Sequence, residues 1–272
     1  MTTIDIFVVV FSGLLGLVIG SFLNVVVWRL PQGRSLSRPG SACPTCGHPI
    51  RWYDNIPVAS WLVLRGRCRD CGQPISARYP LVELATGLFF AGVAWWAVGS
   101  AGITVVTVLA LAAFLYLAAI SVALALIDLD SHTLPNKIVL PAYVVGIVLL
   151  GSASIASSDF ESLIRAGIGM VAMYVAYFLM AIAYPGGMGF GDVKLAGVLG
   201  LFLAWLGWGE LLVGAFAAFV LGGVFSIILL AFRRAGRKSG IPFGPWMLAG
   251  AWVGIFLGDS IFAGYLSLFG LG

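Results

Sequence analysis

Residues 186–194 read GGMGFGDVK and lie between two long apolar runs. The glycines allow tight turns and close approach of another backbone. Asp192 falls at a predicted membrane boundary, where an ionisable side chain is costly and is more often functional than decorative. A second acidic cluster, Asp128-Leu129-Asp130, ends another apolar run. Two carboxylates brought to one membrane face could share a proton and activate water. The alternative is that Asp192 only caps the next helix.

Composition sets the class of protein. The 272 residues are 61% hydrophobic and 10% charged, with a mean hydropathy of +1.05, which exceeds what a soluble core needs and predicts a polytopic membrane protein. The apolar runs are continuous rather than alternating, which favours an all-α bundle over a β-barrel. We predict about eight transmembrane helices, near residues 6–28, 80–98, 103–127, 138–155, 163–184, 195–208, 211–232, and from 246 to either 256 or beyond 259. The first is expected to be retained rather than cleaved.

Charge placement predicts the orientation. With eight spans and the N-terminus outside, 14 of the 15 Lys and Arg residues lie on the cytoplasmic side, and only Arg165 lies outside. The positive-inside rule therefore supports this topology, in which both acidic clusters face the cytoplasm. The net charge of +4 is not taken as a nucleic-acid signal. We predict three parts: a first helix over 1–30, a cytoplasmic domain over 31–79, and a membrane domain over 80–272.

Four cysteines indicate a metal site in the predicted cytoplasmic domain. They form two C-x-x-C pairs, each followed by a glycine: Cys43, Cys46, Cys68 and Cys71. Four thiolates make a closed, tetrahedral and hence structural Zn²⁺ site in a zinc-ribbon-like domain. Disulfides are the alternative, and a reducing cytoplasm disfavours them. A redox role for either pair is weaker, because no thioredoxin-like pattern surrounds them.

These motifs together resemble the bacterial prepilin peptidases (leader peptidase / N-methyltransferase), which are GxGD aspartyl proteases. The resemblance spans nearly the whole chain. A GxGD string alone is weak, but the ordered set is specific. The matching segments are 20–31, the two cysteine pairs, 54–58 with 60–61, 78–83, Asp128 with Leu134-Pro135, 189–194 and 241–245.

The resemblance implies an enzyme of the bacterial inner membrane with two activities. It would cleave the leader of type IV prepilins or type II secretion pseudopilins at the cytoplasmic face, beside membrane lipid. It would then N-methylate the new N-terminus with S-adenosylmethionine. The implied catalytic pair is Asp128 and Asp192, without a catalytic metal. Asp130 is the rival first aspartate, but on a helix it would point away from Asp128.

Other residues near the aspartates and in the cysteine segment are predicted to support catalysis or methyl-donor binding. Gly189 and Gly191 are expected to let an extended substrate backbone approach Asp192. Lys194 would steady an oxyanion or anchor at lipid headgroups. The methyl-donor site shows no Rossmann glycine motif. The weak candidates for contacts with the methyl donor are Asp54, Asn55 and Glu83. The alternative for each of them is a purely structural role.

Two other functions fit parts of this pattern. Intramembrane carboxylates also suit a proton-coupled transporter, although here they gather on one face and no inverted repeat is evident. A non-enzymatic pilus or secretion assembly factor would use the cysteine domain to dock a partner. Such a docking protein should tolerate Asp192→Asn, whereas a peptidase should not.

Overall fold

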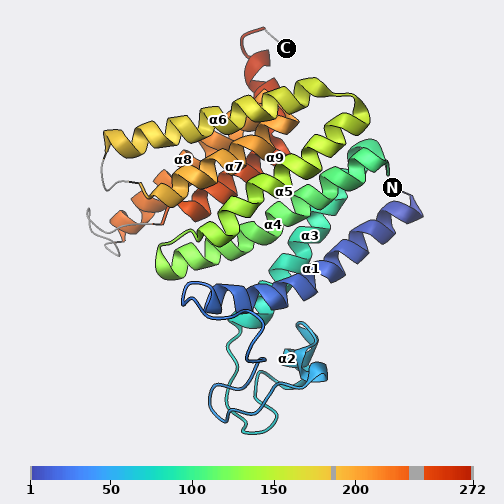
Figure 1. The fold of residues 1–272 in the computed structure, drawn as a ribbon, viewed down its shortest axis with the longest axis vertical. Coiled ribbons are helices and arrows are strands. Elements are labelled where there is room, and N and C mark those ends of the chain that lie inside the picture. Colours follow the sequence, from blue (N-terminus) through green and yellow to red (C-terminus); the bar gives the residue numbers. More distant parts are fainter. Residues whose placement is uncertain (1, 185–187, 233–241, 271–272) are drawn as a thin grey trace. The chain divides into compact units, whose positions relative to one another are not determined.

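The computed structural model describes residues 2–184, 188–232 and 242–270, and it is all-α over these ranges, with no β-strand in them. This confirms the predicted fold class. The elements are labelled in Figure 1, and their bounds are α1 Thr3–Arg29, the 3₁₀ turn η1 Trp52–Asn55, α2 Ala59–Val63, α3 Arg78–Ala101, α4 Val105–Ser131, α5 Asn136–Ser157, α6 Phe160–Ala183, α7 Phe190–Leu206, α8 Trp208–Ala231 and α9 Gly244–Ser267.

Within the described ranges, seven helices are long and apolar enough to cross a membrane: α1, α3, α4, α5, α6, α8 and α9. The eighth long helix, α7, has 17 residues. At about 1.5 Å per residue it is about 25 Å long, slightly short of a hydrocarbon core of about 30 Å. The eight predicted helices are therefore present, and α7 is the short one that the sequence indicated.

Most predicted helix boundaries lie within three residues of those observed, and three boundaries bear on the site or were left open. Helix α4 continues through Asp128 to Ser131 instead of stopping near Ile127. Helix α7 begins at Phe190 rather than Leu195, because Phe190, Gly191 and Asp192 form its first turn after the N-cap Gly189. Helix α9 runs past Asp259 to Ser267, which decides between the two predicted ends. Apolar runs locate helix centres well, but polar residues at helix ends are easily taken for loops.

Residues 1–123 form one compact unit. In it, α1 packs closely on α3 because glycines on α1 leave room for the facing backbone. A Cβ atom on Gly16 would lie 2.7 Å from the Thr86 carbonyl oxygen, and one on Gly20 would lie 2.8 Å from the Glu83 Cα. The amide of Asn24 donates to the Tyr79 carbonyl over 3.2 Å. Small residues and an interhelical hydrogen bond are typical of membrane helix pairs.

Residues 124–272 form the second compact unit. Helix α7 lies among α5, α6, α8 and α9 (Figure 1), and most of its residues are buried. Phe202 and Leu195 on α7 are fully buried. A helix that is apolar on all sides belongs inside a bundle, so α7 forms the centre of this unit.

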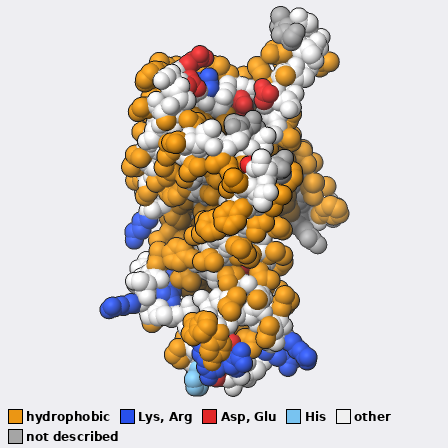
Figure 2. Space-filling model, turned by 90° about the vertical axis from the view of Figure 1, so that its right-hand side faces the viewer, with side chains coloured by type: hydrophobic (Ala, Val, Ile, Leu, Met, Phe, Trp, Pro, Cys, Tyr) orange, Lys and Arg blue, Asp and Glu red, His pale blue; other side chains and the backbone are white. Residues whose placement is uncertain are grey.

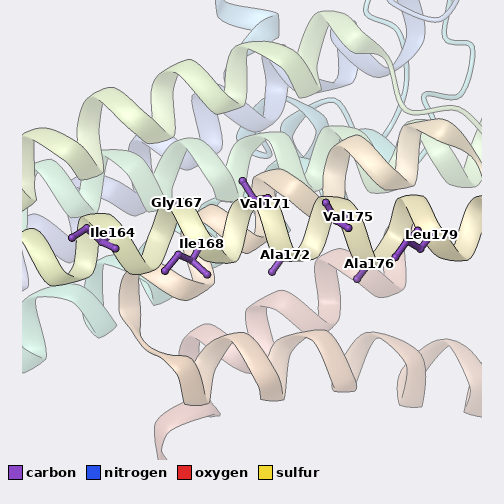
Figure 3. A pocket seen from close by; sticks show the side chains of 8 residues that line it. All are labelled: Ile164, Gly167, Ile168, Val171, Ala172, Val175, Ala176 and Leu179. Carbon is purple, nitrogen blue, oxygen red and sulfur yellow. The ribbon is translucent and has the colours of Figure 1, made fainter.

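Much of the helical surface is apolar. Hydrophobic side chains cover large areas of the face seen in Figure 2. The outward face of α6 carries a shallow apolar groove (Figure 3), lined by Ile164, Gly167, Ile168, Val171, Ala172, Val175, Ala176 and Leu179. Exposed apolar area of this extent is unusual for a soluble monomer and fits a helical bundle in lipid.

Some residues named in the sequence predictions lie outside the described ranges. These are Gly186 and Gly187 of the glycine stretch, the basic residues Arg233, Arg234, Arg237 and Lys238, and Ile241 of the late motif.

Candidate active site and metal centre

Two buried carboxylates lie at the ends of two helices. Asp128 is in the last turn of α4 and Asp192 in the first turn of α7, and they are 5% and 9% exposed. Asp130, two residues after Asp128, is exposed. Two helical residues separated by one other point in nearly opposite directions, so the structure buries Asp128 and turns Asp130 outward as expected.

Asp192 closes the first turn of its own helix. Its Oδ2 accepts a hydrogen bond of 3.0 Å from the Gly189 backbone N–H, and its own N–H donates to the Gly189 carbonyl over 3.1 Å. A carboxylate in a first turn is also favoured by the helix dipole. Asp192 thus does cap α7, and the capping bond fixes one of its two oxygens. Capping and catalysis are compatible in this geometry.

Asp128 is held by the start of α9. Its Oδ2 accepts a buried hydrogen bond of 3.1 Å from the backbone N–H of Gly244, the first residue of α9. The first N–H groups of a helix lack partners inside the helix and readily bind anions. Each aspartate therefore has one oxygen fixed by a backbone N–H.

The elements that carry the two aspartates meet at one residue, Leu134. Leu134, in the loop after α4, packs against the first turn of α7 and the start of α9. A Cβ on Gly191 would lie 2.9 Å from the Leu134 Cβ, and a Cβ on Gly244 would lie 3.2 Å from the Leu134 Cδ2. The end of α4, the loop after it and the starts of α7 and α9 therefore converge.

The predicted supporting residues have specific neighbours. Gly189 donates its N–H to Asp192, and Gly191 leaves room for Leu134. The Lys194 ammonium donates to Asn136 Oδ1 over 3.0 Å and lies 5.1 Å from the ring centre of Phe190. These contacts link the start of α7 to the start of α5. An approach of substrate to the two glycines stays a prediction.

The four cysteines come together as predicted. Their Sγ atoms all lie within 4.8 Å of one another, and Cys43 and Cys71 are 3.8 Å apart at sulfur with no disulfide between them. Backbone N–H groups of Cys46 and Thr45 lower the pKa of the Cys43 thiol to about 6, which favours its thiolate form, whereas the pKa of Cys46 is raised and that of Cys71 is raised to about 12 by desolvation and the neighbouring thiols. Four clustered thiols fit the tetrahedral ligand set of structural Zn²⁺.

The turn of each C-x-x-C pair depends on its following glycine. Gly47 and Gly72 have φ values of +73° and +72°, a region that glycine adopts without strain. Their N–H groups donate over 2.9 Å to the carbonyls of Cys43 and Cys68. The two pairs are therefore built alike, each with its cysteines directed toward a common centre.

The weak methyl-donor candidates make structural contacts. Arg69 binds the Asp54 carboxylate with two nitrogens, Nε at 2.9 Å from Oδ2 and Nη2 at 2.6 Å from Oδ1. This hydrogen bonding lowers the pKa of Asp54. Glu83, 8% exposed, accepts a 2.7 Å hydrogen bond from the Val58 N–H. Asn55 is exposed in η1. Asp54 and Glu83 thus fasten the cysteine segment, and their contact with a methyl donor remains a prediction.

Sequence reasoning did not find the Gly244 N–H or Leu134 as neighbours of the aspartates. Both were noted only as parts of motifs. The sequence Pro242-Phe243-Gly244-Pro245 could have indicated this contact. Pro245 favours the start of a helix, and Gly244 beside it suggests that another group approaches the backbone closely.

Fold and site together define a polytopic helical membrane protein with a pair of buried aspartates and a separate Cys₄ cluster. Two protein-family models together match most of the chain. The model of the Bacterial Peptidase A24 N-terminal domain matches residues 14–97, and the model of the Type IV leader peptidase family matches residues 115–227. The chain belongs to the type IV leader peptidase family.

Relatives match along nearly their whole length. A protein of Stutzerimonas stutzeri named prepilin leader peptidase/N-methyltransferase is 37% identical over 281 residues, covering 93% of this chain and 91% of the relative. Proteins of the same name from Pseudomonas aeruginosa and Aeromonas hydrophila are 36% and 40% identical, each covering 94% of this chain and 93% of the relative. No solved structure shows significant similarity to the chain.

Proposed function

We propose that the chain cleaves the leader peptide of type IV prepilins or type II secretion pseudopilins and then N-methylates the new N-terminal residue. The names of the relatives and their full-length similarity support both activities. The observation that carries the peptidase assignment is that the end of α4 with buried Asp128 and the first turn of α7 with buried Asp192 converge around Leu134. Family membership favours this function over a transporter or a docking factor.

The cleavage chemistry follows from two neighbouring carboxyl groups. Both cannot ionise cheaply, so one retains a proton and the other acts as a base. The base takes a proton from water, and the water oxygen bonds to the scissile carbonyl carbon. The protonated partner polarises the carbonyl oxygen, and a proton then passes to the leaving amine as the C–N bond breaks. Because the pair titrates as a unit, the acid and base are not assigned separately.

The backbone donors prepare the pair for this task. Gly189 and Gly244 each fix one oxygen of an aspartate, which orients the remaining oxygen without a moving side chain. Such preorganisation is worth more than flexible contacts, because small misplacements of reacting groups are costly.

Methyl transfer would use S-adenosylmethionine, which supplies an electrophilic methyl group to the new N-terminal amine. The neutral amine would take the methyl group as its bond to the sulfonium sulfur breaks, leaving S-adenosylhomocysteine, and the methylated ammonium would then lose a proton. We place this activity near the cysteine segment, whose Zn²⁺ is structural. Asp54, Asn55 and Glu83 are its candidate contacts.

The proposed location is the bacterial inner membrane, with the N-terminus outside and both sites on the cytoplasmic face. The seven long apolar helices support a multi-pass membrane protein. The distribution of Lys and Arg supports the orientation.

The test is leader cleavage by purified, detergent-solubilised protein, read as product masses with and without S-adenosylmethionine. We expect Asp128→Asn and Asp192→Asn to abolish cleavage, and Asp130→Asn, an exposed neighbour on the same helix, to retain it. A methyl-sized mass gain that requires S-adenosylmethionine would support the second activity. Thermal unfolding of each variant controls for folding. Cleavage that survives in folded Asp192→Asn would overturn the proposed mechanism.

A further inference from the structure

Arg165 on α6 was predicted to be the one outer cation, and its guanidinium binds the end of a different helix. Its side chain is 14% exposed. Nε donates to the Ala204 carbonyl over 2.6 Å, and Nη2 donates to the carbonyls of Trp205 and Leu206 over 2.8 and 3.0 Å. All three carbonyls belong to the last turn of α7, the helix that begins with the Asp192 turn.

This contact supplies hydrogen-bond donors to the C-terminal end of α7. The last carbonyls of any helix have no partner within it, and the helix dipole makes that end negative. A planar guanidinium presents several N–H groups in a fixed fork and keeps its charge. Arg165 therefore satisfies three carbonyls and offsets the dipole at once.

The α6–α7 interface itself is made of small residues. A Cβ on Gly169 would lie 2.8 Å from the Gly200 carbonyl oxygen, and a Cβ on Gly200 would lie 2.8 Å from the Met173 Cβ. Glycine contacts bring the helix backbones close. This close fit holds the two backbones together, and directional hydrogen bonds at the ends of α7 add a further restraint on its axial position.

Polar contacts do occur at both ends of α7. At the C-terminal end, Trp205 Nε1 donates to Ser154 Oγ over 2.9 Å, beside the Arg165 contacts. Near the N-terminal end, the Tyr143 hydroxyl donates to the Lys194 carbonyl over 2.6 Å. The Lys194 ammonium also donates to Asn136 Oδ1 at that end, but Arg165 is the side chain that binds the most backbone carbonyls of α7. It acts about 20 Å from Asp192, given a rise of about 1.5 Å per residue.

We propose that Arg165 is a positioning residue for leader cleavage, holding α7 in the axial register that sets Asp192 beside Asp128. The inference rests on the proposed function of the aspartate pair. A helix transmits an axial shift along its length, so a slip at Leu206 moves Asp192 by a similar distance. A misplacement of about 1 Å can cost about a hundredfold in rate.

The experiment compares Arg165→Ala and Arg165→Lys with a matched control, Glu161→Gln. Glu161 is the exposed ionic partner of Arg165, at 3.5 Å, so its substitution leaves the carbonyl contacts in place. For each variant we would measure kcat and KM of leader cleavage, N-methylation of a peptide already cleaved, thermal unfolding, and hydrogen exchange of residues 190–194.

We expect Arg165→Ala to lower kcat by about a hundredfold with KM unchanged. Methylation of the cleaved peptide should persist, and hydrogen exchange at 190–194 should rise. Arg165→Lys should restore part of the rate, because an ammonium can also donate to carbonyls, and Glu161→Gln should resemble wild type.

Two results would overturn the inference. One is a wild-type kcat in Arg165→Ala. The other is a parallel loss of cleavage, methylation and folded protein with no rescue by lysine, which would indicate a general stabilising role. A wild-type protein that does not cleave would instead refute the proposed function. Exchange at 190–194 would still show whether Arg165 holds the start of α7.

Discussion

Gly244 contacts Asp128 through its backbone, and this contact leaves no room for a side chain. Its N–H donates to Asp128 Oδ2 over 3.1 Å. A Cβ at the same residue would lie 2.7 Å from that oxygen and 3.2 Å from the Leu134 Cδ2. Real Cβ atoms essentially never approach within 3.0 Å of a heavy atom. Gly244→Ala must therefore displace the Asp128 carboxylate, the start of α9, or both.

The size of the effect follows from the bond at risk. A hydrogen bond to a charged group contributes about 1.5–3 kcal/mol. If displacement removes this bond from the reactive arrangement, the barrier rises by a similar amount, and the rate falls by about ten- to 150-fold. We expect KM to change little, because the bond orients the proposed catalytic carboxylate rather than the leader peptide.

The assay is single-turnover cleavage of a synthetic prepilin by Gly244→Ala. Gly264→Ala is the matched control: it lies in the same helix, and a Cβ there would meet no atom within 4 Å. That control should retain activity and gain up to about 1 kcal/mol of helix propensity. Thermal unfolding and methylation of a cleaved peptide would identify a variant that fails to fold. Wild-type kcat in folded Gly244→Ala would refute the reasoning.

Two further predictions concern the metal centre and a helix cap. We expect elemental analysis to find about one Zn²⁺ per chain. The substitution Cys68→Ser should lower the metal content and increase proteolysis of residues 40–76. A metal content that Cys68→Ser leaves unchanged would contradict the Cys₄ site. Hydrogen bonds from the Ser162 side chain and backbone lower the pKa of Asp159, the cap of α6. The stabilisation by Asp159 is therefore present above its unfolded pKa of about 3.9 and is lost at lower pH. The Tm difference between wild type and Asp159→Ala should shrink below about pH 4, and a constant difference would contradict this.

Much of the fold was predictable because membrane helices are apolar over their whole length. The continuous runs located all eight long helices, and the shortness of α7 was visible in the sequence. The errors lie at helix ends. Asp128 and Asp192 were placed just outside helices that in fact contain them, because polar residues in a terminal turn resemble a loop when only hydropathy is considered.

The site was predictable in its residue types and not in its partners. Carboxylates and cysteines are chemically distinctive, so Asp128, Asp192 and the four thiols could be named from the sequence. The partner of Asp192, Gly189, is local, but the partner of Asp128 is distant, because Gly244 lies 116 residues away. Arg165, which binds the end of α7, lies 39 residues from Ala204. Neither periodicity nor local spacing encodes such pairs. Glu83 and Val58, 25 residues apart, escaped prediction for the same reason.

The ends of helices explain why the two aspartates need different support. Asp192 occupies a first turn, where the helix dipole favours a carboxylate, and Gly189 beside it supplies the fixed donor. Asp128 occupies a last turn, where the dipole opposes negative charge. Its donor must come from elsewhere, and the start of α9 provides both an N–H and a dipole of the favourable sign. One carboxylate is thus held by its own helix and the other by a helix distant in sequence, which makes the packing of α9 part of the proposed catalytic arrangement.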